Sequence, residues 1–180
     1  MKTLLISTCA YALNDREFVF PISEILGENK HDILYFEDCN EKIVSSYNRI
    51  IICGTTLQDS FYIGWLQFFD DLLKKFDGPI LGICSGMQIL TSIFGISGLI
   101  DNVEIGMVEV KTLKPNKLFE GTFQAYNLHR YSVQDSDKFS VLAKSDGCIQ
   151  AVKHVSKEIF VISFHPEVRN EEIISNFLKI

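Results

Sequence analysis

The sequence predicts an α/β protein in which helices cover both faces of a central, mostly parallel mixed sheet, giving three layers. Short apolar runs alternate with segments of helical periodicity over the first 95 residues. One of these runs, residues 79–83, passes directly into a helical pattern at Met87, Leu90 and Phe94. The rest of the chain contains closely spaced strand patterns, so parallel strands should precede antiparallel ones.

Each element of the first half has a local signal. The run 49–53 is apolar without alternation, which is typical of a strand buried on both faces of a parallel sheet. Residues 18–26 have Pro21 near the start and Gly27 at the end, which favours a helix. Residues 60–76 carry aromatic side chains at helical spacing, which we interpret as core packing. The predicted strands are 4–6, 33–36, 49–53 and 79–83, and the other predicted helix before residue 60 is 41–47.

The second half is predicted to be mostly strands followed by a final helix. Turn sequences such as 114–116 (Lys-Pro-Asn) and 145–147 (Ser-Asp-Gly) separate the apolar runs. The predicted strands are 104–113, 121–126, 131–134, 140–143, 148–154 and 159–164, and the helix is 170–178. Without a linker or repeat, we expect residues 1–180 to form a single domain.

Composition narrows the class of protein. The chain has 180 residues, of which 47% are hydrophobic, and a net charge of −6, so a nucleic-acid or membrane-binding surface is not expected. The apolar part of the N-terminus is too short for a signal peptide. The cysteine count is odd, five, with no C-x-x-C pair, which indicates reduced thiols in the cytoplasm and no zinc ribbon.

The stretch 82–86 reads G-I-C-S-G and predicts a sharp strand-to-helix turn around Cys84. Gly82 and Gly86 remove the Cβ atoms that would crowd such a turn. A cysteine there faces unpaired backbone N–H groups and the positive end of the helix dipole, which favour the thiolate. Most buried cysteines are inert core residues, so the motif alone does not establish a nucleophile.

A second stretch supplies the partners that a thiol nucleophile requires. The apolar run 160–164 ends at His165, Pro166 and Glu167. Proline stiffens the turn, so the carboxylate and the imidazole can lie side by side. Nucleophile, base and orienting acid are then all present. His31 and His154 are interpreted as a surface turn and a strand end.

Together, G-I-C-S-G-M-Q and F-H-P-E-V resemble the class I glutamine amidotransferases, over nearly the whole chain. The resemblance implies a flavodoxin-like form of the predicted fold and a catalytic set of Cys84, His165 and Glu167. It also implies an oxyanion hole built from the backbone N–H groups of Gly54 and Ser85.

Further positions match the family's substrate contacts. Gln88 matches the motif glutamine that helps to hold the substrate. His129, with Arg130 and Tyr131 beside it, matches a short histidine-containing loop that contacts the amino-acid part of glutamine. Thr55 and Arg130 depart from the family pattern, which has glycine or another small residue there.

The resemblance implies hydrolysis of the side-chain amide of L-glutamine without a metal or organic cofactor, with ammonia passing to an ATP-dependent synthase subunit. The stretches 104–110 and 118–121 and the H-P-E-V ending most resemble the glutaminase half of guanosine monophosphate synthetase. Two alternatives remain open from the sequence. One is a γ-glutamyl peptidase on the same scaffold, and the other is a non-catalytic regulatory homologue whose pocket is closed by Thr55 and Arg130.

Overall fold

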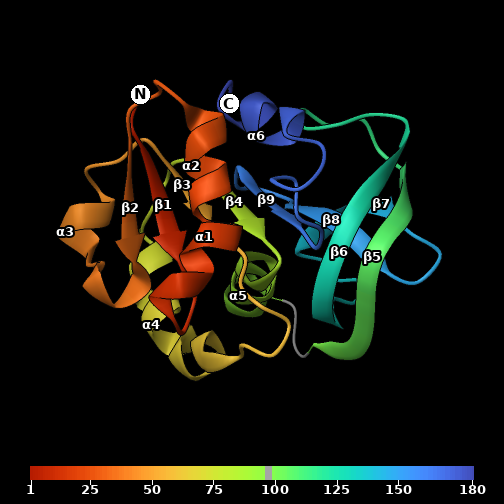
Figure 1. Cartoon of the computed structure of the whole chain (residues 1–180), viewed down its shortest axis with the longest axis horizontal. Coiled ribbons are helices and arrows are strands. Elements are labelled where there is room, and N and C mark those ends of the chain that lie inside the picture. Colours follow the sequence, from red (N-terminus) through yellow and green to blue (C-terminus); the bar gives the residue numbers. More distant parts are fainter. Residues whose placement is uncertain (96–98) are drawn as a thin grey trace.

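The computed structural model describes residues 1–95 and 99–180, and its strands form one nine-stranded sheet (Figure 1). The strands are β1 (Thr3–Ser7), β2 (His31–Tyr35), β3 (Arg49–Ile52), β4 (Ile80–Ile83), β5 (Ile100–Thr112), β6 (Thr122–Ser132), β7 (Phe139–Lys144), β8 (Ile149–His154) and β9 (Ile159–Ile162). Their order is β2-β1-β3-β4-β9-β8-β7-β5-β6. Strands β2, β1, β3, β4 and β9 pair in parallel, and β8, β7, β5 and β6 continue the sheet with antiparallel pairs. The mixed sheet expected from the sequence is confirmed.

Helices cover both faces of the parallel part. They are α1 (Asp15–Phe18), α2 (Phe20–Leu26), α3 (Glu41–Val44), α4 (Leu66–Leu73), α5 (Ser85–Phe94) and α6 (Glu172–Phe177). Helix α2 contacts α6 on one side, while α4 contacts both α3 and α5 on the other. In the described ranges, none of the helices has both the length and the apolar character needed to cross a bilayer.

Alternation along the central strands divides the apolar side chains between two cores. Leu4 and Ile6 of β1 belong to the core beneath α4 and α5, whereas Leu5 between them belongs to the core beneath α2 and α6. All three side chains are fully buried, and each contributes about 1.5–3 kcal/mol relative to exposure. The three-layer arrangement therefore follows from the two-residue period of a strand.

Three of the predicted helices differ from the expectation. The predicted helix 18–26 is α2 preceded by α1, which starts earlier at Asp15, and the two helices meet at Val19 with φ −115°. The segment 60–76 begins as a 3-10 helix over Phe61–Trp65 and becomes α-helical only in α4. The predicted helix 41–47 ends earlier, at Val44. Side-chain periodicity predicts a buried face but does not distinguish the tighter 3-10 turn from an α-helical one.

The larger correction concerns residues 121–134, which were expected to be two strands joined by a loop at 127–131. Strand β6 runs through this segment without interruption, because β5 provides a partner along its length. An irregularity between Asp101 and Glu104 shifts the register of the two strands without ending their pairing. The predicted second strand, 33–36, also begins earlier, so His31 lies in β2 rather than in a surface turn and its Nε2 contacts Ser23 Oγ at 2.6 Å. His154 ends β8, as expected.

Helix α5 packs against the strands through two glycines. A Cβ on Gly82 would lie 2.5 Å from the carbonyl oxygen of Gly86, and a Cβ on Gly86 would lie 2.4 Å from that of Ile52. Both distances are below any contact that a real side chain makes, so the first turn of α5 approaches the sheet only because these residues are glycine.

We expect Gly86→Ala to lower the free energy of unfolding by about 1–3 kcal/mol, because the added methyl group meets backbone that cannot move aside. Gly64→Ala is the matched control, since a Cβ there meets nothing within 4 Å. Urea denaturation measures both. Equal losses in the two variants would contradict the packing role of Gly86.

Candidate active site

Cys84 occupies the turn between β4 and α5 in a strained conformation. Its φ is 52° and its ψ is −104°, whereas positive φ is otherwise found among the described non-glycine residues only at Asn170. The backbone is fixed on both sides: Cys84 N–H donates to Ile162 O at 2.9 Å, and Cys84 O accepts from Gln88 N–H at 3.2 Å. The thiol is therefore presented at the N-terminus of α5 by a conformation that strand and helix hold together.

His165 and Glu167 form a buried pair on the turn after β9. Imidazole Nδ1 lies 2.7 Å from Glu167 Oε1, and the side chains are 1% and 0% exposed. Val168 N–H donates to His165 O at 3.2 Å across Pro166, so the turn is closed and His165 is held beside Glu167. His165 N–H also donates to Tyr126 O of β6 at 2.9 Å.

Gly54, at the end of β3, lies where these two groups converge. A Cβ on Gly54 would lie 2.6 Å from His165 Cε1 and 3.3 Å from Cys84 Cβ. The thiol and the imidazole therefore meet over the same backbone atom. Any side chain at position 54 would push them apart.

The electrostatics of the pair favour a charged imidazole. Burial lowers the pKa of His165, but the carboxylate of Glu167 and the thiol of Cys84 raise it, and the net result lies well above 6.5. Glu167 occupies Nδ1, so buried Nε2 is the ring nitrogen left to exchange a proton with Cys84 or with a reacting group.

The start of α5 is fixed by hydroxyl groups. Ser85 Oγ donates to Cys53 O at 3.1 Å and lies 2.8 Å from Thr8 Oγ1. As the first residue of α5, Ser85 has no intrahelical acceptor for its N–H. The backbone of Gly54 also lies close to Cys84. Thr8, which follows β1, was not among the predicted site residues, although its hydroxyl contacts Ser85.

Asp59 organises the loop that follows β3. Its carboxylate accepts the hydroxyl of Thr55 at 2.7 Å, the N–H of Ala10 at 2.7 Å and the N–H of Phe61 at 3.1 Å. The hydroxyl of Thr55 is thereby engaged at the pocket wall. Sequence analysis missed Asp59, although an acidic residue before a turn of aromatic residues is a common capping signal.

A narrow pocket of about 10 Å³ borders Cys84, between residues 55–62, the start of α5 and residues 128–131. Gln88 is buried in its wall, and its Oε1 accepts a hydrogen bond from the hydroxyl of Tyr62. Burial, and next the nearby Cys84, raise the pKa of Tyr62, so this hydroxyl remains a donor. Sequence analysis missed Tyr62. A buried tyrosine hydroxyl needs a hydrogen-bond partner, and this could be expected from the sequence, but the sequence does not indicate that the partner is Gln88.

The predicted histidine-containing loop lies on β6, and its side chains point in different directions. Cys84 Sγ donates to Leu128 O at 3.6 Å, so the backbone of β6 contacts the thiol directly. Arg130 is exposed at the rim, 3.0 Å from Asp101, with its guanidinium 5.4 Å from the ring centre of Tyr131. His129 also lines the pocket, but its Nε2 lies 3.2 Å from a carboxylate oxygen of Glu104 on β5.

His129, Glu104 and Cys148 form a second polar cluster, in which the pKa of each group is shifted. Burial lowers the pKa of His129, against the opposing effect of Glu104. Burial raises the pKa of Glu104, but hydrogen bonds from Cys148 and Gln150 bring it below its ordinary value. Burial also raises the pKa of Cys148, to about 12. In the absence of another ligand, Glu104 is thus ionised, with a neutral imidazole and a neutral thiol beside it.

The fold and the site define an α/β protein with a cysteine at a strand–helix elbow and an imidazole–carboxylate pair above it. Residues 25–179 match the family described as glutamine amidotransferase class-I, and the chain belongs to this family.

Comparison with curated proteins shows which members of the family the chain is similar to. The chain is 40% identical over 122 residues to the glutamine-hydrolyzing GMP synthase subunit of Methanosphaera stadtmanae, in an alignment that covers 61% of this chain and 64% of the relative. It is 36% identical over 117 residues to the protein of the same name in Pyrococcus furiosus, covering 59% and 62%. The chain thus spans less than two thirds of the length of these relatives.

Solved structures support the fold. A Thermoplasma acidophilum protein described as a candidate GMP synthase subunit superposes with a TM-score of 0.87 at 20% identity, over 99% of this chain and 92% of the other. A Thermotoga maritima glutamine amidotransferase gives a TM-score of 0.74 at 19% identity, over 98% and 80%. At these identities the likeness shows the architecture alone.

We expect Glu167→Gln to lower the pKa of His165, because it removes the negative charge that raises this pKa. Protonated His165 contributes stability that is fully present below its unfolded pKa of about 6.5 and is lost as pH rises through its higher folded pKa. The stability gap between wild type and Glu167→Gln should therefore be larger near pH 6 than at alkaline pH. NMR titration of the imidazole and urea denaturation across pH measure the two effects.

Glu109→Gln, at an exposed position of β5, is the matched control and should leave the titration of His165 unchanged. An unaltered His165 titration in Glu167→Gln would contradict the electrostatic role of the pair.

Proposed function

We propose that this protein hydrolyses the side-chain amide of L-glutamine to glutamate and ammonia, with Cys84 as nucleophile. The observation that carries the proposal is the convergence of Cys84 and the His165–Glu167 pair over Gly54. A thiolate, a proton donor and two backbone N–H donors are the groups that acyl transfer from an amide requires.

The reaction proceeds in two halves. The Cys84 thiolate attacks the amide carbon, and the oxygen that becomes negative is stabilised by the N–H groups of Gly54 and Ser85. His165 gives its proton to the departing nitrogen, ammonia leaves, and a γ-glutamyl thioester remains on Cys84. Neutral His165 then takes a proton from water as the water attacks the thioester. Glutamate leaves, and the thiolate and the imidazolium are restored.

We further infer that the ammonia serves a synthase subunit that consumes ATP. The support is the name of the curated relatives, which describes a glutamine-hydrolyzing subunit of GMP synthase, and the match to the glutamine amidotransferase class-I family over residues 25–179. The five cysteines are all free thiols, which supports a reducing compartment such as the cytoplasm.

The pocket beside Cys84 encloses only about 10 Å³, which disfavours a large γ-glutamyl compound more than a small amide substrate. Turnover of glutamine compared with γ-glutamyl dipeptides tests this preference. Faster cleavage of the dipeptides would instead indicate a γ-glutamyl peptidase.

Cys84→Ala and His165→Ala should each abolish release of ammonia from glutamine, measured with and without a candidate synthase subunit. Cys39→Ala is the matched control, because Cys39 is also a buried free thiol but belongs to the core beneath α4. It should retain wild-type turnover. Normal hydrolysis by Cys84→Ala would overturn the assignment. A glutamine-analogue electrophile that fails to label Cys84 even with the partner present would support a non-catalytic homologue.

Tyr62→Phe should raise KM for glutamine by about fivefold with a smaller change in kcat, since the hydroxyl that fixes Gln88 is lost and a net hydrogen bond contributes about 1 kcal/mol. Tyr47→Phe is the matched control, because its hydroxyl bonds Asp32 outside the pocket. Steady-state kinetics measure KM and kcat for both variants. An unchanged KM in Tyr62→Phe would show that Tyr62 does not help to position the substrate.

A further inference from the structure

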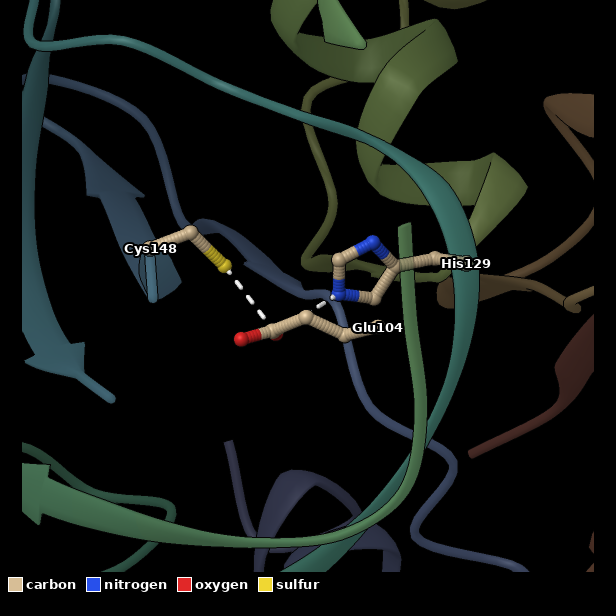
Figure 2. Close-up of side chains that lie close together, drawn as sticks. All are labelled: Glu104, His129 and Cys148. Atoms are coloured by element: carbon tan, nitrogen blue, oxygen red, sulfur yellow. Dashed lines mark hydrogen bonds and ion pairs between the residues drawn. The ribbon is translucent and has the colours of Figure 1, made fainter. Parts of the chain in front are cut away.

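A second group of reactive side chains lies beside β6, outside the proposed chemistry. Glu104 comes from β5, His129 from β6 and Cys148 from the turn before β8, and Figure 2 shows the three side chains converging. One donor atom from each lies within 4.8 Å of the other two. Both His129 Nε2 and Cys148 Sγ are 3.2 Å from Glu104 Oε2.

We propose that Glu104, His129 and Cys148 bind a divalent transition metal ion of the zinc type, with a fourth position open to water. Nitrogen, oxygen and sulfur around tetrahedral Zn²⁺, at bond lengths of about 2.0–2.3 Å, are separated by about 3.3–3.5 Å. The measured separations from the carboxylate oxygen are within a few tenths of an ångström of these values. Imidazole with thiolate selects zinc-like metals over Mg²⁺ or Ca²⁺.

The charges balance when the metal binds. The thiol of Cys148 loses its proton to solvent as the sulfur–metal bond forms. Neutral His129 coordinates through Nε2, and its proton moves to Nδ1, a buried atom with no hydrogen-bond partner in the described structure. One thiolate and one carboxylate then neutralise the two charges of the cation, and a neutral imidazole completes the set. The chain supplies this neutralisation in a partly buried place, where an uncompensated charge would be costly.

The surrounding side chains orient Glu104. Asn127 Nδ2 and Gln150 Nε2 donate to its Oε2 at 2.7 and 2.6 Å, and Ser145 Oγ donates to its Oε1 at 3.3 Å. The short amide bonds are the strong ones, whereas the contacts of His129 and Cys148 are the long ones that a cation would replace. Outer hydrogen bonds that fix a ligating carboxylate are characteristic of metal sites.

The site is accessible and borders the thiol pocket, which His129 also lines. Cys148 is only partly buried and lines a surface hollow with Ser145 and Gly147. A metal would tie β5, β6 and the turn before β8 together. His129 directly follows Leu128, whose carbonyl contacts Cys84, so the bound metal would fix the segment of β6 that borders the pocket.

Titration with Co²⁺ tests the site directly, using the full chain in a Cys84→Ala background so that the pocket thiol contributes nothing. The protein is first treated with chelator and kept in a non-thiol reductant. We expect one Co²⁺ per chain, a thiolate-to-metal charge-transfer band, and a melting temperature that rises on addition of Zn²⁺.

Adding Cys148→Ser should abolish the band, and adding Glu104→Gln should weaken binding by at least about tenfold, since even outer-shell changes cost 10–100-fold. Adding Cys39→Ser is the matched control, because that thiol bonds only the Tyr35 carbonyl, and it should leave the titration unchanged. Far-UV circular dichroism checks that each variant folds. A thiolate band that survives Cys148→Ser, or the absence of any band in the parent, overturns the proposal. Neither result depends on whether glutamine is hydrolysed.

Discussion

The positive φ of Cys84 is the constraint on which the arrangement of this molecule depends. An L-residue at φ 52° carries a strain of about 1–3 kcal/mol and persists only where its surroundings leave no alternative. The hydrogen bond to β9 fixes one side of the residue, and the first helical bond of α5 fixes the other. Because Gly82, Gly86 and Gly54 have no side chains, the strand, the helix and the imidazole can all approach the turn closely. Close packing of backbone against backbone therefore stabilises a conformation that Cys84 would not adopt alone.

The sequence predicted the parts of the site that depend on neighbouring residues. The elbow at 82–86 and the pair at 165–167 are local patterns, and their geometry is determined within a single turn. The alternation of strands and helices could also be predicted, because buried parallel strands are continuous apolar runs in the sequence. The convergence of these distant motifs was inferred from family resemblance rather than from the residues alone.

The features that could not be predicted from the sequence depend on contacts between residues far apart in the chain. Strand β6 is continuous because β5 lies beside it, and residues 127–131 alone carry no sign of that pairing. Tyr62, Thr8 and Asp59 acquire their roles from hydrogen bonds to residues that are distant in the sequence or placed by a turn. Such contacts are determined by how the layers stack, which a linear pattern of apolar and polar residues does not specify.

The two departures from the family pattern, at positions 55 and 130, each come with an acidic partner. Thr55 directs its hydroxyl to Asp59, and Arg130 directs its guanidinium to Asp101 at the exposed rim. A buried hydroxyl without a partner would cost free energy, and a loose cation beside the thiol would compete with His165 for the negative charge that forms there. Both groups line the pocket, but their polar atoms are directed to the acidic partners and not to Cys84. The substitutions thus change the wall and the rim of the pocket while the converging thiol, imidazole and carboxylate remain in place.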